Sequence, residues 1–117
     1  MSKNQNSECT IPIVIKRYNT YLKRLKGLMF QVKPIQNEGI LLEPCNSIHM
    51  FFMFFPIDVV FLNRDNQAVK VKENVAPWSA IFPVKHAYKA LELPIGTIKK
   101  YALTEGCTIK LTNLSNR

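Results

Sequence analysis

The stretch SIHMFFMFFPIDVVFL, residues 47–62, decides the fold of this 117-residue chain. It holds five of the seven Phe residues and two of the four Met residues, but only one carboxylate, Asp58, and one imidazole, His49. Burying an unpaired charge is costly, and a purely structural core segment has little use for one. The stretch therefore either builds the core around one satisfied carboxylate or forms the wall of a site.

Length and composition predict one globular domain. Apolar residues make up 47% of the chain and charged residues 21%, which is ordinary globular usage. A chain of this length fits a single domain, and neither repeats nor a flexible linker divides it. We expect the domain to span residues 10–114. Residues 1–9 are polar at their start and lack an apolar pattern, so we expect a disordered N-terminal segment there.

Periodicity predicts a β-rich α+β domain. The hairpin formed by residues 57–62 and 69–72 is the clearest element, because an apolar run and an alternating run flank the turn-forming residues 63–66. We expect about six or seven short strands in a curled sheet or small open barrel, with two short helices. The strands are expected at 11–16, 39–43, 50–54, 57–62, 69–72, 88–93 and 107–111, and the helices at 21–28 and 97–103.

The net charge of +8 is unevenly distributed. Such an asymmetry favours binding of nucleic acid or an anionic membrane, although a solvated basic face would give the same pattern. Aromatic residues are not interleaved with the bases as nucleic-acid recognition usually requires. The candidate polyanion-binding residues are Lys16, Arg17, Lys23, Arg24 and Lys26, in a segment from Lys16 to Lys33 without acids.

The cysteines indicate a reducing, cytoplasmic location. The chain has three widely spaced cysteines, Cys9, Cys45 and Cys107, and an odd number without close spacing does not indicate a disulfide framework. The first ten residues lack the apolar core of a secretory signal, and the Phe-rich run is too short for a transmembrane segment. We expect neither a metal nor another cofactor, because Cys45 and His49 are only two ligands, and His86 and Cys107 would have to join them through the fold.

Asp58 is the leading candidate for a site residue. One interpretation is a structural carboxylate that accepts backbone N–H bonds at the Pro56 bend or pairs with one buried base. The other is that Asp58 and Glu92 are two acid–base groups acting on a glycan or another small polar substrate. Cys45 with His49 is the alternative catalytic pair. Glu92 is otherwise an outward charge on an alternating strand, and Trp78 is either a core anchor or an aromatic platform for a ligand.

Three motifs carry a resemblance to a known family. LKGLMF at residues 25–30, IHMFFMFFPID at 48–58 and ALELPIG at 90–96 resemble, in order and spacing, the motifs of the DUF192 family of uncharacterised conserved proteins. The second is similar to the family branch that reads I-H-x-F-F-M-x-F-P-I-D. The resemblance covers residues 11–114 and implies a compact β-rich α+β domain without an assigned activity.

The chain departs from the family pattern at three places. Met50 and Phe54 stand where the branch usually has Thr and Arg, and residues 105–107 stand where the family usually has Gly-Asp. The run is therefore more apolar than in relatives, which favours a core or contact surface over chemistry. We predict a non-enzymatic binding module with a cleft around the FPID segment. The cleft would be lined by His49, Asp58 and Glu92, with Cys45 and Trp78 nearby, and its partner would be an anionic ligand or a protein.

Overall fold

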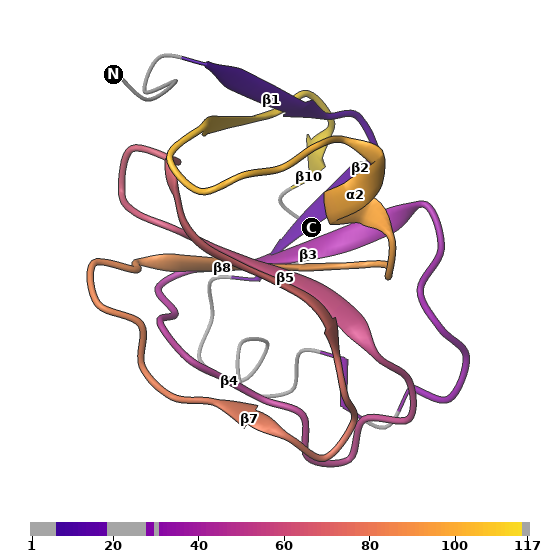
Figure 1. Ribbon diagram of the computed structural model, residues 1–117. Helices are drawn as coiled ribbons and strands as arrows, with labels where there is room; N and C mark the ends of the chain where they lie inside the picture. Colours follow the sequence, from indigo (N-terminus) through magenta and orange to yellow (C-terminus); the bar gives the residue numbers. More distant parts are fainter. Residues whose placement is uncertain (1–6, 19–27, 30, 116–117) are drawn as a thin grey trace.

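A six-stranded sheet forms the centre of the protein in the computed structural model, which describes residues 7–18, 28–29 and 31–115. Its order is β10-β2-β3-β8-β5-β6, so β5 lies between β8 and β6 (Figure 1). The strands of this sheet are β2 (Val14–Tyr18), β3 (Glu38–Leu42), β5 (Ile57–Leu62), β6 (Ala68–Val75), β8 (Lys89–Leu93) and β10 (Leu114–Ser115).

Smaller elements cover the two faces of this sheet. On one face, β1 (Glu8–Ile11) pairs in parallel with β9 (Thr108–Leu111), beside the short helix α2 (Thr97–Lys100). On the other, β4 (Ile48–His49) and β7 (Ala80–Ile81) form an antiparallel ribbon. Figure 1 draws the first group above the six-stranded sheet and the ribbon below it.

Strand β5 is buried at every position because both of its faces are covered. Ile57, Val59 and Phe61 pack into a core on the ribbon side, the ribbon core, together with Met50 and Phe55. The alternate residues of β5, at 58, 60 and 62, point to the α2 side. There, the α2-side core is made by Ile11, Ile15, Leu41, Val60, Leu62, Ala68, Leu91, Leu93, Ile98, Leu103, Cys107 and Ile109. The continuous apolar run of β5 is thus a strand between two cores.

The β-rich class and the hairpin of β5 and β6 are confirmed. The structure describes ten strands, more than predicted. Pro12 divides the first expected strand into β1 and β2, and residues 8 and 9 belong to β1 rather than to an unstructured segment. The strand expected at 50–54 is wrong, because these residues form a turn. The described strands make three sheets and no closed barrel.

Helix α2 is the one helix within the described residues. Its N-cap is Gly96 in a left-handed conformation, at φ 87°, with Thr97 as its first residue. The Thr97 hydroxyl donates to the Pro94 carbonyl, at 2.6 Å. The other expected helix, at 21–28, falls almost wholly outside the described residues and stays a prediction. None of the described helical segments is long and apolar enough to cross a membrane.

Candidate functional site

Asp58 joins β5 to two distant segments. Its side chain is 1% exposed, and each oxygen accepts a backbone N–H. Oδ1 accepts the amide of Asn74, at 2.9 Å, where the β5–β6 register shifts at a bulge. Oδ2 accepts the amide of Ile98 in the first turn of α2, at 3.0 Å. Charge-assisted bonds of this kind are stronger than neutral ones, so Asp58 fixes α2 against the sheet.

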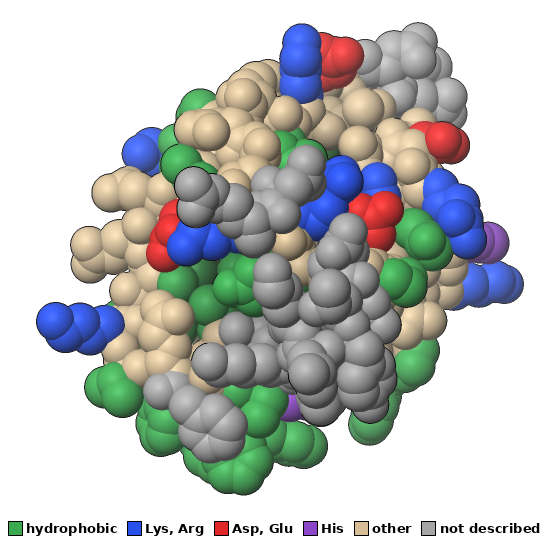
Figure 2. Space-filling model, turned by 180° about the vertical axis from the view of Figure 1, so that it is seen from behind, with side chains coloured by type: hydrophobic (Ala, Val, Ile, Leu, Met, Phe, Trp, Pro, Cys, Tyr) green, Lys and Arg blue, Asp and Glu red, His purple; other side chains and the backbone are tan. Residues whose placement is uncertain are grey.

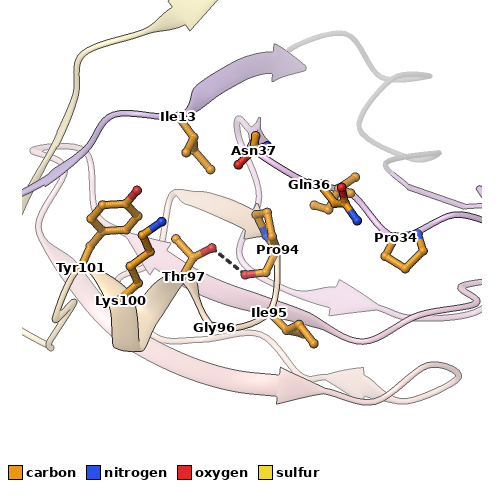
Figure 3. A pocket seen from close by; sticks show the side chains of 11 residues that line it. Ile13, Pro34, Gln36, Asn37, Pro94, Ile95, Gly96, Thr97, Lys100 and Tyr101 are labelled. Carbon is orange, nitrogen blue, oxygen red and sulfur yellow. Dashed lines mark hydrogen bonds between the residues drawn. The ribbon is translucent and has the colours of Figure 1, made fainter.

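A groove of about 480 Å³ lies beside the turn that Asp58 holds. One wall is the segment from Pro94 to Tyr101, which leads from β8 through α2, and the other is the approach to β3 at residues 34–37, with Ile13 at the edge (Figure 3). Pockets of this size accommodate small molecules. The lining residues are Ile13, Pro34, Ile35, Gln36, Asn37, Pro94, Ile95, Gly96, Thr97, Lys100 and Tyr101.

The groove is lined mainly by uncharged residues. Three isoleucines and two prolines are among its lining residues, and polar side chains lie on both sides of it. Lys100 is the one charged residue among those that line it, and its Nζ lies 5.5 Å from the centre of the Tyr101 ring. Because none of the described lining residues is acidic, the groove is electropositive.

Glu92 does not share this site with Asp58. In the β5–β8 register Glu92 pairs with Val59, and paired residues lie on the same face of a sheet. Asp58 precedes Val59, so the two carboxylates point to opposite faces. Glu92 is 5% exposed rather than outward-facing, its Oε1 has no hydrogen-bond partner, and burial raises the pKa of its carboxyl to about 7.

His49 and Cys45 lie on the ribbon side, away from α2. The His49 ring packs on Phe51 with a centroid distance of 5.4 Å, and its buried Nδ1 lacks a hydrogen-bond partner. The Cys45 thiol donates to the carbonyl of Ser47, at 3.0 Å. No three His, Cys, Asp or Glu side chains gather as metal ligands within the described residues. The structure therefore does not bring the five predicted cleft residues together.

Trp78 is a surface residue rather than a core anchor. It is 54% exposed in the turn before β7, where its ring contacts Phe52 at a centroid distance of 5.1 Å and Phe54 at 6.5 Å. Its neighbours therefore belong to an exposed aromatic group rather than to the groove beside α2.

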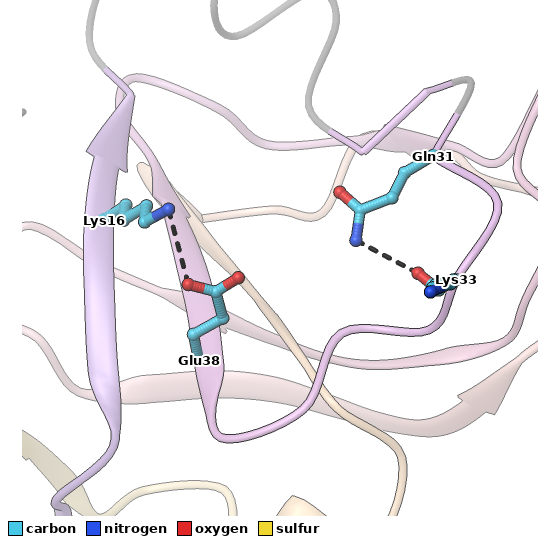
Figure 4. A network of polar contacts seen from close by, with 4 residues as sticks. All are labelled: Lys16, Gln31, Lys33 and Glu38. Carbon is cyan, nitrogen blue, oxygen red and sulfur yellow. Dashed lines mark hydrogen bonds and ion pairs between the residues drawn. The ribbon is translucent and has the colours of Figure 1, made fainter.

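Two of the predicted polyanion-binding bases are paired with carboxylates. Lys16 Nζ lies 3.4 Å from Glu38 Oε1 (Figure 4), and Arg17 Nε lies 3.6 Å from Glu43 Oε1. These pairs reduce the positive field that the sequence alone predicts for β2. Near them, the Gln31 amide donates to the carbonyl of Lys33, at 3.1 Å. Lys23, Arg24 and Lys26 lie outside the described residues.

Sequence reasoning missed the groove residues. The signal available was the LPIG end of the third motif, because Pro94 and Gly96 mark a turn that exposes backbone beside Lys100. The opposite wall at 34–37 carried no comparable pattern. It joins the site through the pairing of β3 with β8, which brings residues about fifty positions apart into register.

Comparisons with known proteins agree with the motifs. The DUF192 family model, described as an uncharacterized ACR, matches residues 2–111. UPF0127 protein TK1120 of Thermococcus kodakarensis is 34% identical over 108 residues, covering 88% of this chain and 68% of the relative. A UPF0127 protein of Thermococcus sibiricus is 36% identical over 90 residues, covering 72% of this chain and 56% of that relative.

Two solved structures share the fold. A protein of Sinorhizobium meliloti 1021, suggested to be a transcription regulator, aligns with a TM-score of 0.70 and 24% identity over 79% of this chain and 76% of its own. A protein of unknown function from Novosphingobium aromaticivorans aligns with a TM-score of 0.67 and 21% identity, over 79% and 70%. At these identities the likeness concerns the fold alone. Since the family model matches nearly the whole chain, the chain belongs to the DUF192 family, as its motifs predict.

Proposed function

We propose that this chain is a ligand-binding module whose site is the groove beside α2. The observation that carries the proposal is the link between Asp58 and Ile98, because a buried carboxylate fixes the wall of an otherwise open groove. Sites that bind small molecules are largely preformed, and a fixed wall reduces the entropy lost on binding. The FPID and LPIG motifs then serve one purpose, since the first holds the turn that the second forms.

The lining favours a small organic acid with a compact apolar body. Ile13, Pro94 and the 55% exposed Ile95 offer carbon surface to such a body, and the Lys100 ammonium offers the pairing charge for a carboxylate. The side-chain amides of Gln36 and Asn37 provide further donors on the opposite wall. An acidic partner suits the groove because no acidic side chain is among its described lining residues.

The proposal is tested by amide chemical-shift titration of isotope-labelled protein with isovalerate and phenylacetate. We expect the shifts to concentrate at Gly96, Thr97 and Tyr101. Lys100→Met should weaken binding roughly ten-fold or more, because a hydrogen bond to a charged group contributes about 1.5–3 kcal/mol. Lys99→Met is the matched control, since Lys99 is exposed on the same helix but does not line the groove.

Two results would count against this function. One is a set of shifts scattered over the surface, with none at residues 94–101. The other is an equal loss of affinity in the Lys99 and Lys100 variants, which would mean that net charge rather than the groove attracts the acid.

The paired-carboxylate reaction has weaker support. Asp58 uses both oxygens for backbone amides, and Glu92 points to the other face of the sheet. Acid–base catalysis by two carboxylates requires both to reach one substrate. The placement of these two residues therefore favours binding over this chemistry.

A further inference from the structure

A group of exposed aromatic side chains lies at the ribbon end of the molecule. Figure 2 shows hydrophobic side chains gathered at the lower end, where Figure 1 draws β4 and β7. Five of the eight large hydrophobic residues that are exposed in the described chain belong to this group, so the apolar exposure is concentrated rather than scattered. We call it the aromatic end: Phe51, Phe52, Phe54, Trp78 and Phe82.

The backbone holds these rings outward. Two turns carry most of them, and the turns are tied together because the amides of Trp78 and Met50 donate to the carbonyls of Met50 and Ser79, at 2.7 and 2.6 Å. Met50 itself is fully buried beneath the turn. Phe52 and Trp78 have φ angles of 62° and 66°, a left-handed conformation that bulky residues rarely adopt. Strained residues of this kind are concentrated at functional sites.

A basic hollow adjoins the aromatic end. It has a volume of about 440 Å³ and is lined by Lys70, Lys72 and Lys85 together with residues 80–84, which include the 83% exposed Phe82. Lys70 and Lys72 pair with Phe61 and Val59, whose side chains face the ribbon core, so both lysines extend on the ribbon side of β6. None of the described lining residues is acidic.

We propose that the aromatic end docks on the surface of an anionic phospholipid membrane. Trp and Phe side chains settle at the boundary between headgroups and acyl chains, and flanking lysines are attracted to lipid phosphates. Phe82 and Trp78 would enter this boundary, and the three lysines of the hollow would meet the phosphates. The groove lies beside α2, which Figure 1 draws on the opposite side of the six-stranded sheet from β4 and β7, so docking leaves the α2 wall of the groove open to solvent.

Charge and ring packing favour a membrane over nucleic acid. Single-stranded nucleic acid needs free ring faces on which successive bases stack, interleaved with bases along a groove. Here the rings of Phe52 and Phe54 pack edge to face with Trp78, and the lysines lie to one side of them. A cluster of rings beside a basic hollow matches a headgroup interface better.

Trp78 is the only tryptophan in the sequence and reports docking directly. When phosphatidylcholine vesicles that contain phosphatidylglycerol are added, we expect the Trp78 emission to shift to the blue and the whole chain to float with the vesicles. We expect neither effect with vesicles of phosphatidylcholine alone. The double variant Lys72→Gln/Lys85→Gln should weaken binding roughly 25-fold, at about five-fold for each lysine. Lys99→Gln/Lys110→Gln removes equal charge from exposed positions outside the hollow and should weaken it far less.

Phe82→Ser should also weaken vesicle binding without lowering the melting temperature, because the side chain is almost wholly exposed. Four results would overturn the proposal. The first is no binding of the chain to the anionic vesicles at low salt, and the second is that the two lysine pairs weaken vesicle binding equally. The third is that single-stranded oligothymidine displaces the chain from vesicles at a lower concentration than the lipid. The fourth is a blue shift of the Trp78 emission that follows protein concentration in the absence of lipid. The last would show a second copy covering the aromatic end. None of these bears on binding at the groove.

Discussion

At residue 58 the chain places a carboxylate between two backbone amides that belong to different elements. Asn74 and Ile98 donate to its two oxygens. In Asp58→Asn one oxygen becomes an amino group that faces a backbone N–H, so one donor loses its partner and two donors oppose each other. We expect the free energy of unfolding to fall by about 2–4 kcal/mol, since a buried donor without a partner costs about 1–3 kcal/mol and the charge assistance is also lost.

Urea denaturation followed by circular dichroism measures this change. Asp65→Asn is the control, because Asp65 is exposed in the β5–β6 turn and such substitutions usually change stability by about 0.5 kcal/mol or less. If Asp58→Asn and Asp65→Asn lowered the free energy of unfolding equally, the hydrogen bonds from the Asn74 and Ile98 amides would stabilise the fold no more than hydrogen bonds to water do.

Glu92 makes stability depend on pH. Burial raises the pKa of its carboxyl from 4.5 to about 7 in the folded chain, so the folded state binds the proton more tightly than the unfolded state. The contribution of Glu92 to the free energy of unfolding is then greatest below pH 4.5, falls as the pH rises towards 7, and above that stays lower by about 3 kcal/mol. In Glu92→Gln this component disappears, and the variant should be more stable than the parent at pH 8.

Thermal melts between pH 4 and 8 check the prediction, with Glu105→Gln as the exposed control. A parent and a Glu92 variant whose melting temperatures remain parallel across this range would contradict it.

Single residues show how far sequence reasoning reached. The sequence singles out Asp58 as a polar residue in an apolar run, and its interpretation as a carboxylate that accepts backbone amides agrees with the structure. The donors are Asn74 and Ile98, however, rather than residues at the Pro56 bend. Glu92 is interpreted from the sequence either as an outward charge or as a cleft residue with Asp58. The outward interpretation is wrong because alternation of this kind assumes a sheet with one open face. Both faces of β8 are covered, so alternation there separates two cores rather than core from solvent.

At the scale of elements, the hairpin was predictable and the turn at 50–54 was not. Turn chemistry between two regular runs identified β5 and β6. In residues 50–55 the buried side chains are Met50, Met53 and Phe55, a spacing of neither strand nor helix. That spacing arises from contacts with the distant turn before β7, which the local sequence does not contain.

The elements should differ in how often they open. Strand β5 pairs with β8 and β6 and is buried on both faces, whereas the ribbon strands β4 and β7 have two residues each. Local opening is rare where strands are paired on both sides and buried. We therefore expect the amides of Val60 and Phe61 to exchange with solvent deuterium far more slowly than those of His49 and Ile81. Amide exchange followed by NMR measures this, and equal protection of the ribbon would contradict it.

Across the whole molecule, one sheet separates two surfaces with different chemistry. The groove lies with α2 on one side, and the aromatic end lies with the ribbon on the other. We propose different partners for the two surfaces, a small acid for the groove and a lipid surface for the aromatic end, and substitutions can alter each surface separately. The sequence predicts one cleft lined by His49, Asp58 and Glu92, whereas the structure places Asp58 and Glu92 on opposite faces of the sheet. Strand pairing decides which side of the sheet each residue serves, and pairing over long separations is not visible in one sequence.

The central claim is that Asp58 holds the wall of the binding groove. It is tested most directly by the affinity of Asp58→Asn for isovalerate or phenylacetate, measured by amide shift titration at a temperature where the variant is folded. Freeing the Ile98 amide should loosen α2 and weaken binding roughly ten-fold, the effect of about 1.4 kcal/mol of lost preorganisation. An affinity equal to that of the parent chain would contradict the account.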